Sequence, residues 1–291
     1  MEYQCDWIDA FTDQPFGGNG CAVVHDALDL GEDQCRAFVR ETSLTECTFV
    51  GASQVADFRV RYFLAGGEIP FAGHPTLATV LSLLHREKLP GLRITLETGA
   101  GIIPIEIDQS FGQPRVIMTQ IAPEFGPKVD PANIAAIGGI DARDIIGTPQ
   151  IVSTGLPFCI AVVKSHDVLR RLALQPKPLA AFQKAGAALG VMEPFWVTLQ
   201  GATDIGDTFS RLLMAPPNPP EDPFTGSATG AMAAYLWHYA LIEERNFIAE
   251  QGHWLGRPGQ AQVQVLGPQK QIAGVRIAGT GHVLMSGTLM L

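Results

Sequence analysis

The chain has 291 residues, 46% of them hydrophobic and 17% charged, and a formal net charge of −9. This composition is typical of a soluble globular protein, and the length allows two domains of roughly 100–150 residues each. The excess of acidic residues argues against nucleic acid or an anionic membrane surface as a partner.

Signals for export, membrane insertion and zinc binding are missing from the sequence. Residues 1–6 carry acidic charge without a long apolar core, and no apolar run is long enough to span a membrane. The five cysteines are an odd number without C-x-x-C spacing. We therefore expect reduced, mostly buried thiols in a cytoplasmic protein, and no metal site.

The first half of the chain is predicted to consist of strands interrupted by two helices. One helix is predicted over residues 30–42. A second, buried helix is predicted from Pro75 to Leu84, because apolar residues occupy nearly every position and Pro75 suits the first position of a helix. The predicted strands are residues 3–11, 21–24, 43–50 (which begin as a polar turn), 59–64, 93–98, 101–107 and 115–119.

The second half is predicted to start after a linker at residues 122–131, which hold three prolines and a glycine. We expect an N-terminal domain of residues 1–121, joined by a last strand at about 283–291, and a C-terminal domain of residues 122–282. The elements expected in the second half are helices at 130–137 and 179–189, strands at 195–199 and 209–214, a rigid loop at 215–223 and strand-like runs over 261–291. Many strands with few helices favour an α+β (mixed α/β) fold.

Two glycine-containing turns lead into apolar helices at matching places in the two halves. Gly73-His74-x-Thr76 in the first half corresponds to Gly226-Ser227-x-Thr229 in the second. Thr12-x-x-Pro15-Phe16 corresponds in the same way to Thr154-x-x-Pro157-Phe158. These matches indicate a duplicated unit whose two turns face one cleft, where paired helix N-termini are suited to bind a carboxylate.

Four polar residues are candidates for chemistry, and each has a structural alternative. Glu46 lies beside apolar neighbours, which would raise its pKa as a general acid/base requires, but it also fits a solvated or salt-bridged glutamate. His74 fits a substrate contact, a proton carrier or a structural histidine. Asp222 fits a binding residue or a turn former, and Ser227 fits a binding residue or a helix cap.

The sequence contains no motif that indicates another common catalytic chemistry. It contains no G-x-S-x-G elbow, no P-loop lysine and no His-Glu-x-x-His helix. Proton transfer without a cofactor is therefore the favoured chemistry.

At this point the motifs become specific enough to resemble a known family, the PhzF-like proteins of phenazine biosynthesis, which share the diaminopimelate-epimerase fold. The matching segments span nearly the whole chain in the order of the family. They are Asp9-Ala10-Phe11-Thr12 with Gly17-Gly18-Asn19, Leu44-Thr45-Glu46-Cys47-Thr48-Phe49-Val50, Phe71-Ala72-Gly73-His74-Pro75-Thr76-Leu77, Ser153-Thr154-Gly155-Leu156-Pro157-Phe158, Glu221-Asp222-Pro223-Phe224-Thr225-Gly226-Ser227-Ala228, and Glu250-Gln251-Gly252 followed by Gly256-Arg257-Pro258-Gly259.

The resemblance implies two similar domains, each a curled sheet around a central helix, with the active site between them. It implies an isomerase of the trans-2,3-dihydro-3-hydroxyanthranilate type that works without a cofactor, on a small carboxylate substrate and as a homodimer. It also implies that Glu46 transfers the proton. The residues expected to bind substrate are Gly73, His74, Asp222, Gly226, Ser227, Gln251 and Gly252.

Two other functions stay open on this fold. A non-catalytic binding or scaffold protein would keep the same cleft. An amino-acid racemase or epimerase would use two opposed cysteines, one in each glycine-rich loop, and neither loop contains one; Cys47 and Cys159 are expected to be packing residues. The segment 64–68 lacks the Thr-Pro that is usual in the family, which leaves the substrate undecided.

Overall fold

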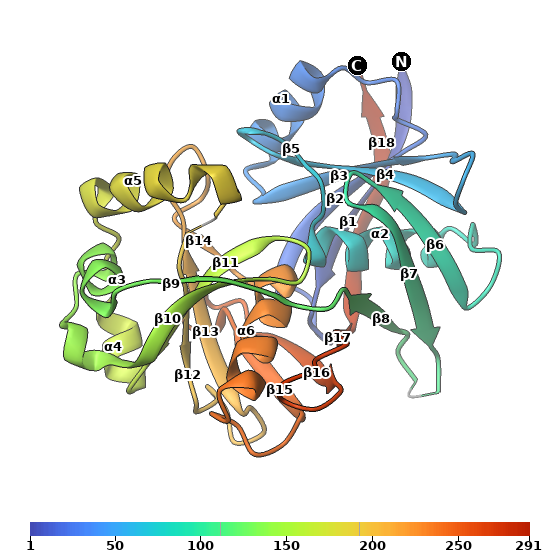
Figure 1. The fold of residues 1–291 in the computed structure, drawn as a ribbon. Coiled ribbons are helices and arrows are strands. Elements are labelled where there is room, and N and C mark those ends of the chain that lie inside the picture. Colours follow the sequence, from blue (N-terminus) through green and yellow to red (C-terminus); the bar gives the residue numbers. More distant parts are fainter. Residues whose placement is uncertain (111, 192) are drawn as a thin grey trace.

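The structure, a computed structural model, describes residues 1–110, 112–191 and 193–291. Its two lobes each contain one buried central helix, α2 (Gly73–His85) or α6 (Gly226–His238), surrounded by strands (Figure 1). Every residue from Gly73 to Leu83 and from Gly226 to Leu236 is buried, because both helices are apolar on all sides. Mixed strands around central helices confirm the predicted fold class.

The first half contains eight strands and two α-helices among the described residues. They are β1 (Glu2–Ala10), β2 (Asn19–His25), α1 (Glu32–Thr42), β3 (Glu46–Gly51), β4 (Phe58–Leu64), β5 (Gly67–Ile69), α2, β6 (Arg93–Thr98), β7 (Gly101–Asp108) and β8 (Arg115–Gln120).

The remainder of the chain adds ten strands, four α-helices and three short 3₁₀ helices within the described residues. They are β9 (Glu124–Lys128), α3 (Pro131–Gly138), η1 (Ala142–Asp144), β10 (Ile145–Ser153), β11 (Pro157–Val163), α4 (His166–Arg171), α5 (Pro176–Ala185), η2 (Ala187–Leu189), β12 (Phe195–Thr198), β13 (Thr208–Leu213), β14 (Glu221–Asp222), α6, β15 (Asn246–Gln251), η3 (His253–Leu255), β16 (Gly259–Leu266), β17 (Gly274–Gly279) and β18 (Gly281–Met290).

The same order of strand pairing occurs twice. In the first half, β1–β2 is antiparallel, β2–β3 parallel, β3–β4 antiparallel and β4–β6 parallel. In the second half, β10–β11, β11–β12, β12–β13 and β13–β15 repeat that series with the same directions. The central helix lies between the fourth and the fifth strand of each series, directly after the short strand β5 or β14. The duplication inferred from short sequence matches is therefore visible in the topology.

The strand that ends each half of the chain pairs with the first strand of the other repeat. Strand β9, which follows the first repeat, pairs with β10, and β18 at the end of the chain pairs with β1. Strands β8 and β17 also pair with each other, so a continuous set of strand pairings connects the two lobes. The chain ends meet as a result, and the N- and C-termini lie side by side in Figure 1.

The expected linker at residues 122–131 is wrong in part, because it contains β9. Residues 124–128 pair with β10 despite Pro127. A proline is tolerated there because β9 is an edge strand, whose outer N–H groups need no partner strand. Helix α2 likewise begins at Gly73, two residues before the prediction, and Pro75 still lies in the first turn, where a missing N–H breaks no helical hydrogen bond.

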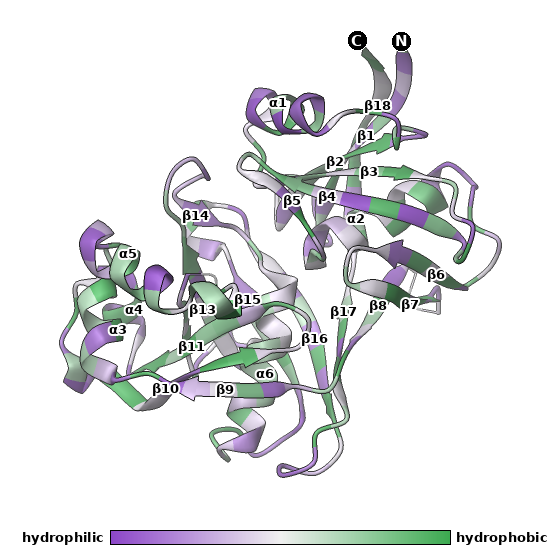
Figure 2. Ribbon diagram, turned by 45° about the horizontal axis from the view of Figure 1, so that its top comes forward, coloured by the Kyte–Doolittle hydropathy of each residue, from purple (hydrophilic) through white to green (hydrophobic). Residues whose placement is uncertain are grey.

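The largest hydrophobic core contains α2 and α6 together with the strand faces around them. Two smaller cores lie on the outer faces of the strands, one under α1 and one under α3, α4 and α5. Figure 2 shows the hydrophobic residues of β11, which is buried from Phe158 to Val163. Among the described residues, the helices are all too short or too polar to cross a bilayer.

Candidate active site

The two central helices meet at their N-termini, and glycine makes this approach possible. A Cβ atom on Gly73 would lie 2.7 Å from the backbone nitrogen of Ser227 and 2.8 Å from Cα of Gly226. Neither N-cap residue, Ala72 or Thr225, caps its helix through a side chain. Free backbone N–H groups of two helices therefore gather at one point.

Glu46 and His74 are brought to this point from different elements. Glu46 is the first residue of β3, and His74 is the second residue of α2. Glu46 Oε2 lies 3.8 Å from His74 Nδ1. Within the part of the chain that the structure describes, Glu46 Oε2 and His74 Nε2 are both buried and have no hydrogen-bond partner. Buried polar atoms normally have partners, so unpaired atoms on these two neighbouring side chains suggest a place for a ligand.

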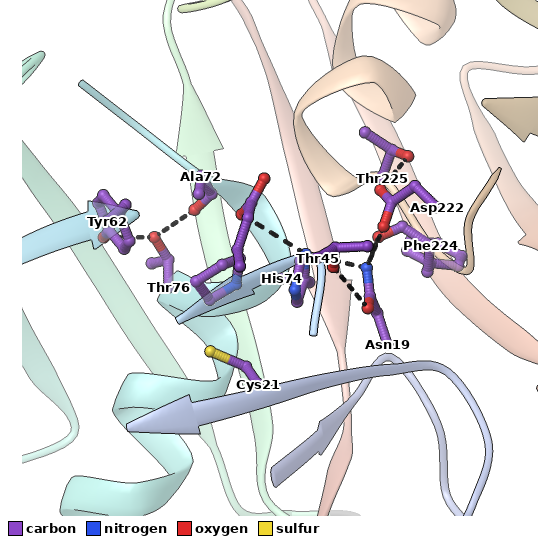
Figure 3. A network of polar contacts seen from close by, with 12 residues as sticks. Asn19, Cys21, Thr45, Tyr62, Ala72, His74, Thr76, Asp222, Phe224 and Thr225 are labelled. Atoms are coloured by element: carbon purple, nitrogen blue, oxygen red, sulfur yellow. Dashed lines mark hydrogen bonds and ion pairs between the residues drawn. The ribbon is translucent and has the colours of Figure 1, made fainter. Parts of the chain in front are cut away.

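Asn19 connects the two halves of the site (Figure 3). Its Nδ2 atom lies 2.6 Å from Asp222 Oδ1, 2.9 Å from the Phe224 carbonyl oxygen and 3.1 Å from His74 Nδ1. Its Oδ1 atom accepts a hydrogen bond of 3.2 Å from Thr45 Oγ1. This pattern fixes the amide orientation, because Oδ1 meets a donor while Nδ2 meets acceptors.

Parallel pairing of β2 and β3 places Asn19 beside Thr45. Cys21 is opposite Glu46 in this register, so the starts of the two strands are adjacent. The turn before Asn19 is formed by Gly18, whose φ of +52° favours glycine. The local sequence therefore determines which side chains point toward α2.

Gln251 and Gly252 hold the loop that contains Asp222 in place. Gln251 Nε2 donates to the Asp222 carbonyl oxygen at 2.7 Å, and its Oε1 accepts from the Thr225 N–H at 3.1 Å. Thr225 Oγ1 donates to Asp222 Oδ2 at 2.5 Å. Gly252 has a φ of +83°, and a Cβ there would lie 2.5 Å from the Pro223 carbonyl oxygen. This packing leaves no room for another residue at position 252.

Burial sets the protonation of the three ionisable groups. It raises the pKa of Glu46 well above its ordinary range, and the negative charge of Asp222 raises it further. Burial raises the pKa of Asp222 to about 6, against hydrogen bonds from Thr225, Asn19 and Thr45 that lower it. Burial also lowers the pKa of His74 to about 3, with the charge of Arg257 adding to the effect. His74 is therefore neutral near pH 7.

All eight residues proposed from the sequence lie at or beside this junction, while four others at the site had been given no role. Asn19, Thr45, Thr225 and Arg257 were only parts of matching motifs. A signal for Asn19 existed, since it follows two glycines directly before a buried strand. Among the described residues, no cluster of three or more His, Cys, Asp or Glu side chains is arranged to hold a metal ion.

Sequence comparison agrees with the expected family. The family described as "Phenazine biosynthesis-like protein" matches residues 8–287. The chain is 30% identical to "Uncharacterized isomerase YfhB" of Bacillus subtilis, over 97% of this chain and 96% of the relative. It is also 30% identical to "Trans-2,3-dihydro-3-hydroxyanthranilate isomerase" of Pseudomonas aeruginosa, over 98% of both proteins. These relatives confirm that the enzyme class is isomerase.

Solved structures agree as well. A PhzF-family phenazine biosynthesis protein of Bacillus anthracis superposes with a TM-score of 0.87 at 28% identity, over 100% of both chains. A hydroxyproline epimerase of Agrobacterium vitis shares the fold with a TM-score of 0.63 at 14% identity, over 99% of this chain and 92% of the other. The chain therefore belongs to the phenazine biosynthesis-like protein family, on a fold that it has in common with epimerases.

Proposed function

We propose that the protein is a cofactor-independent isomerase that moves a proton within a small amino- or hydroxy-carboxylic acid, with Glu46 as the general acid/base. The observation that carries this proposal is the pair of buried, unpartnered atoms, Glu46 Oε2 and His74 Nε2. A bound substrate would supply the missing partners of both.

Glu46 performs the proton transfer in this proposal. As a carboxylate it takes a proton from an sp³ carbon of the substrate, and the C–H electron pair moves into the adjacent unsaturated system. The carboxylic acid so formed then returns a proton to another carbon of the same molecule, so the substrate is neither oxidised nor reduced. A carboxyl group whose pKa lies near the working pH does this best, and such catalysis contributes roughly 10²–10⁴-fold. Its burial beside Asp222 supports the required pKa.

The substrate carboxylate lies at the two helix N-termini in this proposal. Gly73, His74, Gly226 and Ser227 are the first residues of α2 and α6, where free N–H groups and helix dipoles favour an anion. Neutral His74 donates its Nε2–H to the substrate. Asp222 faces the amino or hydroxyl group, and Gln251 and Gly252 hold the Asp222 loop in place.

The first substrate to test is trans-2,3-dihydro-3-hydroxyanthranilate, which has a carboxylate, an amino group and a hydroxyl group. It is suggested by the name of the Pseudomonas aeruginosa relative. We expect Glu46→Gln to lower kcat by at least about 10³-fold, because the amide cannot accept the proton. Calorimetric binding of the substrate should persist in this variant. Glu41→Gln, on the exposed side of α1, is the matched control and should keep full activity. Full activity of the Glu46→Gln enzyme would contradict the proposal.

A cytoplasmic homodimer is the proposed working form. Strand β18 pairs with β1, and its Met285 and Met290 are exposed. An exposed strand edge of this kind favours association. The five free cysteines favour a reducing compartment. Light scattering should give twice the chain mass of 31.2 kDa, and a monomer mass would contradict the dimer.

A further inference from the structure

The segment from Gln251 to Pro258, which we term the clamp segment, holds both polar loops of the active site. Gln251 at its start binds the Asp222–Thr225 loop, as described above. Arg257 and Pro258 at its end bind the Gly17–Gly18 turn, which belongs to the other half of the chain. One short segment therefore fixes the distance between Asn19 and Asp222.

Arg257 makes most of the contacts to the turn. Its Nε donates to the Gly18 carbonyl oxygen at 2.9 Å, and its Nη2 donates to the Gly17 carbonyl oxygen at 2.9 Å. Nη2 also lies 2.7 Å from Oδ1 of Asp9, which is fully buried. A planar guanidinium reaches these three acceptors together, which a lysine ammonium on a single flexible stem does not.

The remaining atoms of the turn are held by the same elements. Asp9 Oδ2 accepts from the Phe16 N–H at 2.7 Å, and the Gly18 N–H donates to the Pro258 carbonyl oxygen at 2.9 Å. The turn that positions Asn19 is thus bound on both sides. The next residue along is Asn19 itself, whose amide spans His74 and Asp222.

The charge of Arg257 also acts on the site. It is one of the causes that keep His74 neutral, after burial. The other charged or ionisable groups facing His74 are Glu46, at 3.8 Å from Nδ1, and Asp222, across the Asn19 amide. Asp9 neutralises part of the Arg257 charge through the ion pair between them.

We propose that Arg257 is a positioning residue, which sets the Asn19 amide, and through it His74 and Asp222, by clamping the Gly17–Gly18 turn of the opposite half. Its effect on turnover rests on the proposed function, but its effect on Asn19 and His74 does not. Arg257 contacts no reacting atom in this proposal.

The test uses three substitutions and two kinds of measurement. Arg257→Met removes the clamp and the charge, whereas Arg257→Lys removes the fork of donors and keeps the charge. Arg276→Met is the matched control, because the Arg276 side chain is 32% exposed and that of Arg257 is 31% exposed. Arg276 lies on β17 and forms an ion pair of 2.8 Å with Glu106 on β7. NMR of selectively labelled protein follows the Asn19 side-chain amide and the His74 imidazole. Kinetics with trans-2,3-dihydro-3-hydroxyanthranilate follow turnover.

We expect the Asn19 amide signals to shift in both Arg257 variants and to stay unchanged in Arg276→Met. The pKa of His74 should rise in Arg257→Met and stay at the wild-type position in Arg257→Lys. We expect kcat to fall by about 100-fold in Arg257→Met with less than a threefold change in KM, because misplacement of about 1 Å has an effect of this size. Arg257→Lys should recover part of that loss.

The two proposals fail in different ways. If the wild type does not convert the substrate but the Asn19 and His74 signals still respond to Arg257→Met, the positioning role stands without the proposed substrate. If a folded Arg257→Met protein keeps the wild-type Asn19 and His74 signals, the positioning role is overturned. Should Arg257→Met fail to fold, the Arg257→Lys amide signals decide the matter, and wild-type signals there overturn it.

Discussion

The buried carboxyl group of Asp222 makes a quantitative prediction about stability. Its pKa is about 6 in the folded protein and 3.8 in an unfolded chain. The folded state therefore holds a proton that the unfolded state releases between these pH values. The resulting stabilisation is complete below pH 3.8 and is lost as the pH rises through 6. The protein should thus be more stable at pH 5 than at pH 8 through this one group.

The size of the effect follows from proton linkage. These two pKa values give about 1.4 kcal/mol more stability at pH 5 than at pH 8. Asp222→Asn removes the titrating group, so the difference in unfolding free energy between wild type and variant should change by this amount. Glu46 adds to it in the same direction, because the variant also loses the charge that raises its pKa.

Urea unfolding at pH 5, 6, 7 and 8 measures this difference directly. Asp13→Asn, an exposed carboxylate on the loop after β1, controls for the change in net charge. A difference between wild type and Asp222→Asn that is constant over this range would refute the reasoning. So would a wild type that gains stability relative to the variant as the pH rises.

Three further outcomes follow from the packing. Gly73→Ala should destabilise the protein by about 1–3 kcal/mol in chemical unfolding, since its Cβ would meet the α6 backbone, whereas Gly66→Ala meets nothing within 4 Å and should be nearly neutral. Asp6→Asn should lower stability by about 3 kcal/mol, because Asp6 is fully buried and its loss leaves Arg86 without its carboxylate; a loss below 1 kcal/mol would contradict this. Burial raises the pKa of the Cys47 thiol to about 12, so little reactive thiolate forms at pH 8. Iodoacetamide at that pH should therefore leave Cys47 unmodified in mass spectra and leave the activity intact. Rapid labelling of Cys47 would argue against this packing.

The sequence predicted the parts of the fold that depend on local pattern. The all-apolar helix after Gly73 and its counterpart after Gly226 are such patterns, and their match indicated the duplication. The pairing of β9 with the second repeat was not visible in this way. It depends on which distant strand β9 pairs with, and a short edge strand with a proline leaves no distinctive pattern. The proposed division at residues 121 and 122 remains a prediction.

The candidate site shows the same difference between residues that a local pattern reveals and residues that depend on distant contacts. Glu46 and His74 stand out in the sequence because polar residues among apolar ones are unusual. The importance of Asn19 and Arg257 lies in contacts across more than 200 residues of sequence, such as that between Asn19 and Asp222. Contacts of this kind depend on the folded chain, so their residues appear in the sequence only as members of motifs.

Proton transfer by Glu46 is the central claim, and one measurement tests it most directly. Proton NMR in D₂O follows trans-2,3-dihydro-3-hydroxyanthranilate in the presence of the wild type or of folded Glu46→Gln protein at equal concentration. We expect conversion by the wild type and none by Glu46→Gln over the same time. Conversion by Glu46→Gln at the wild-type rate would contradict it.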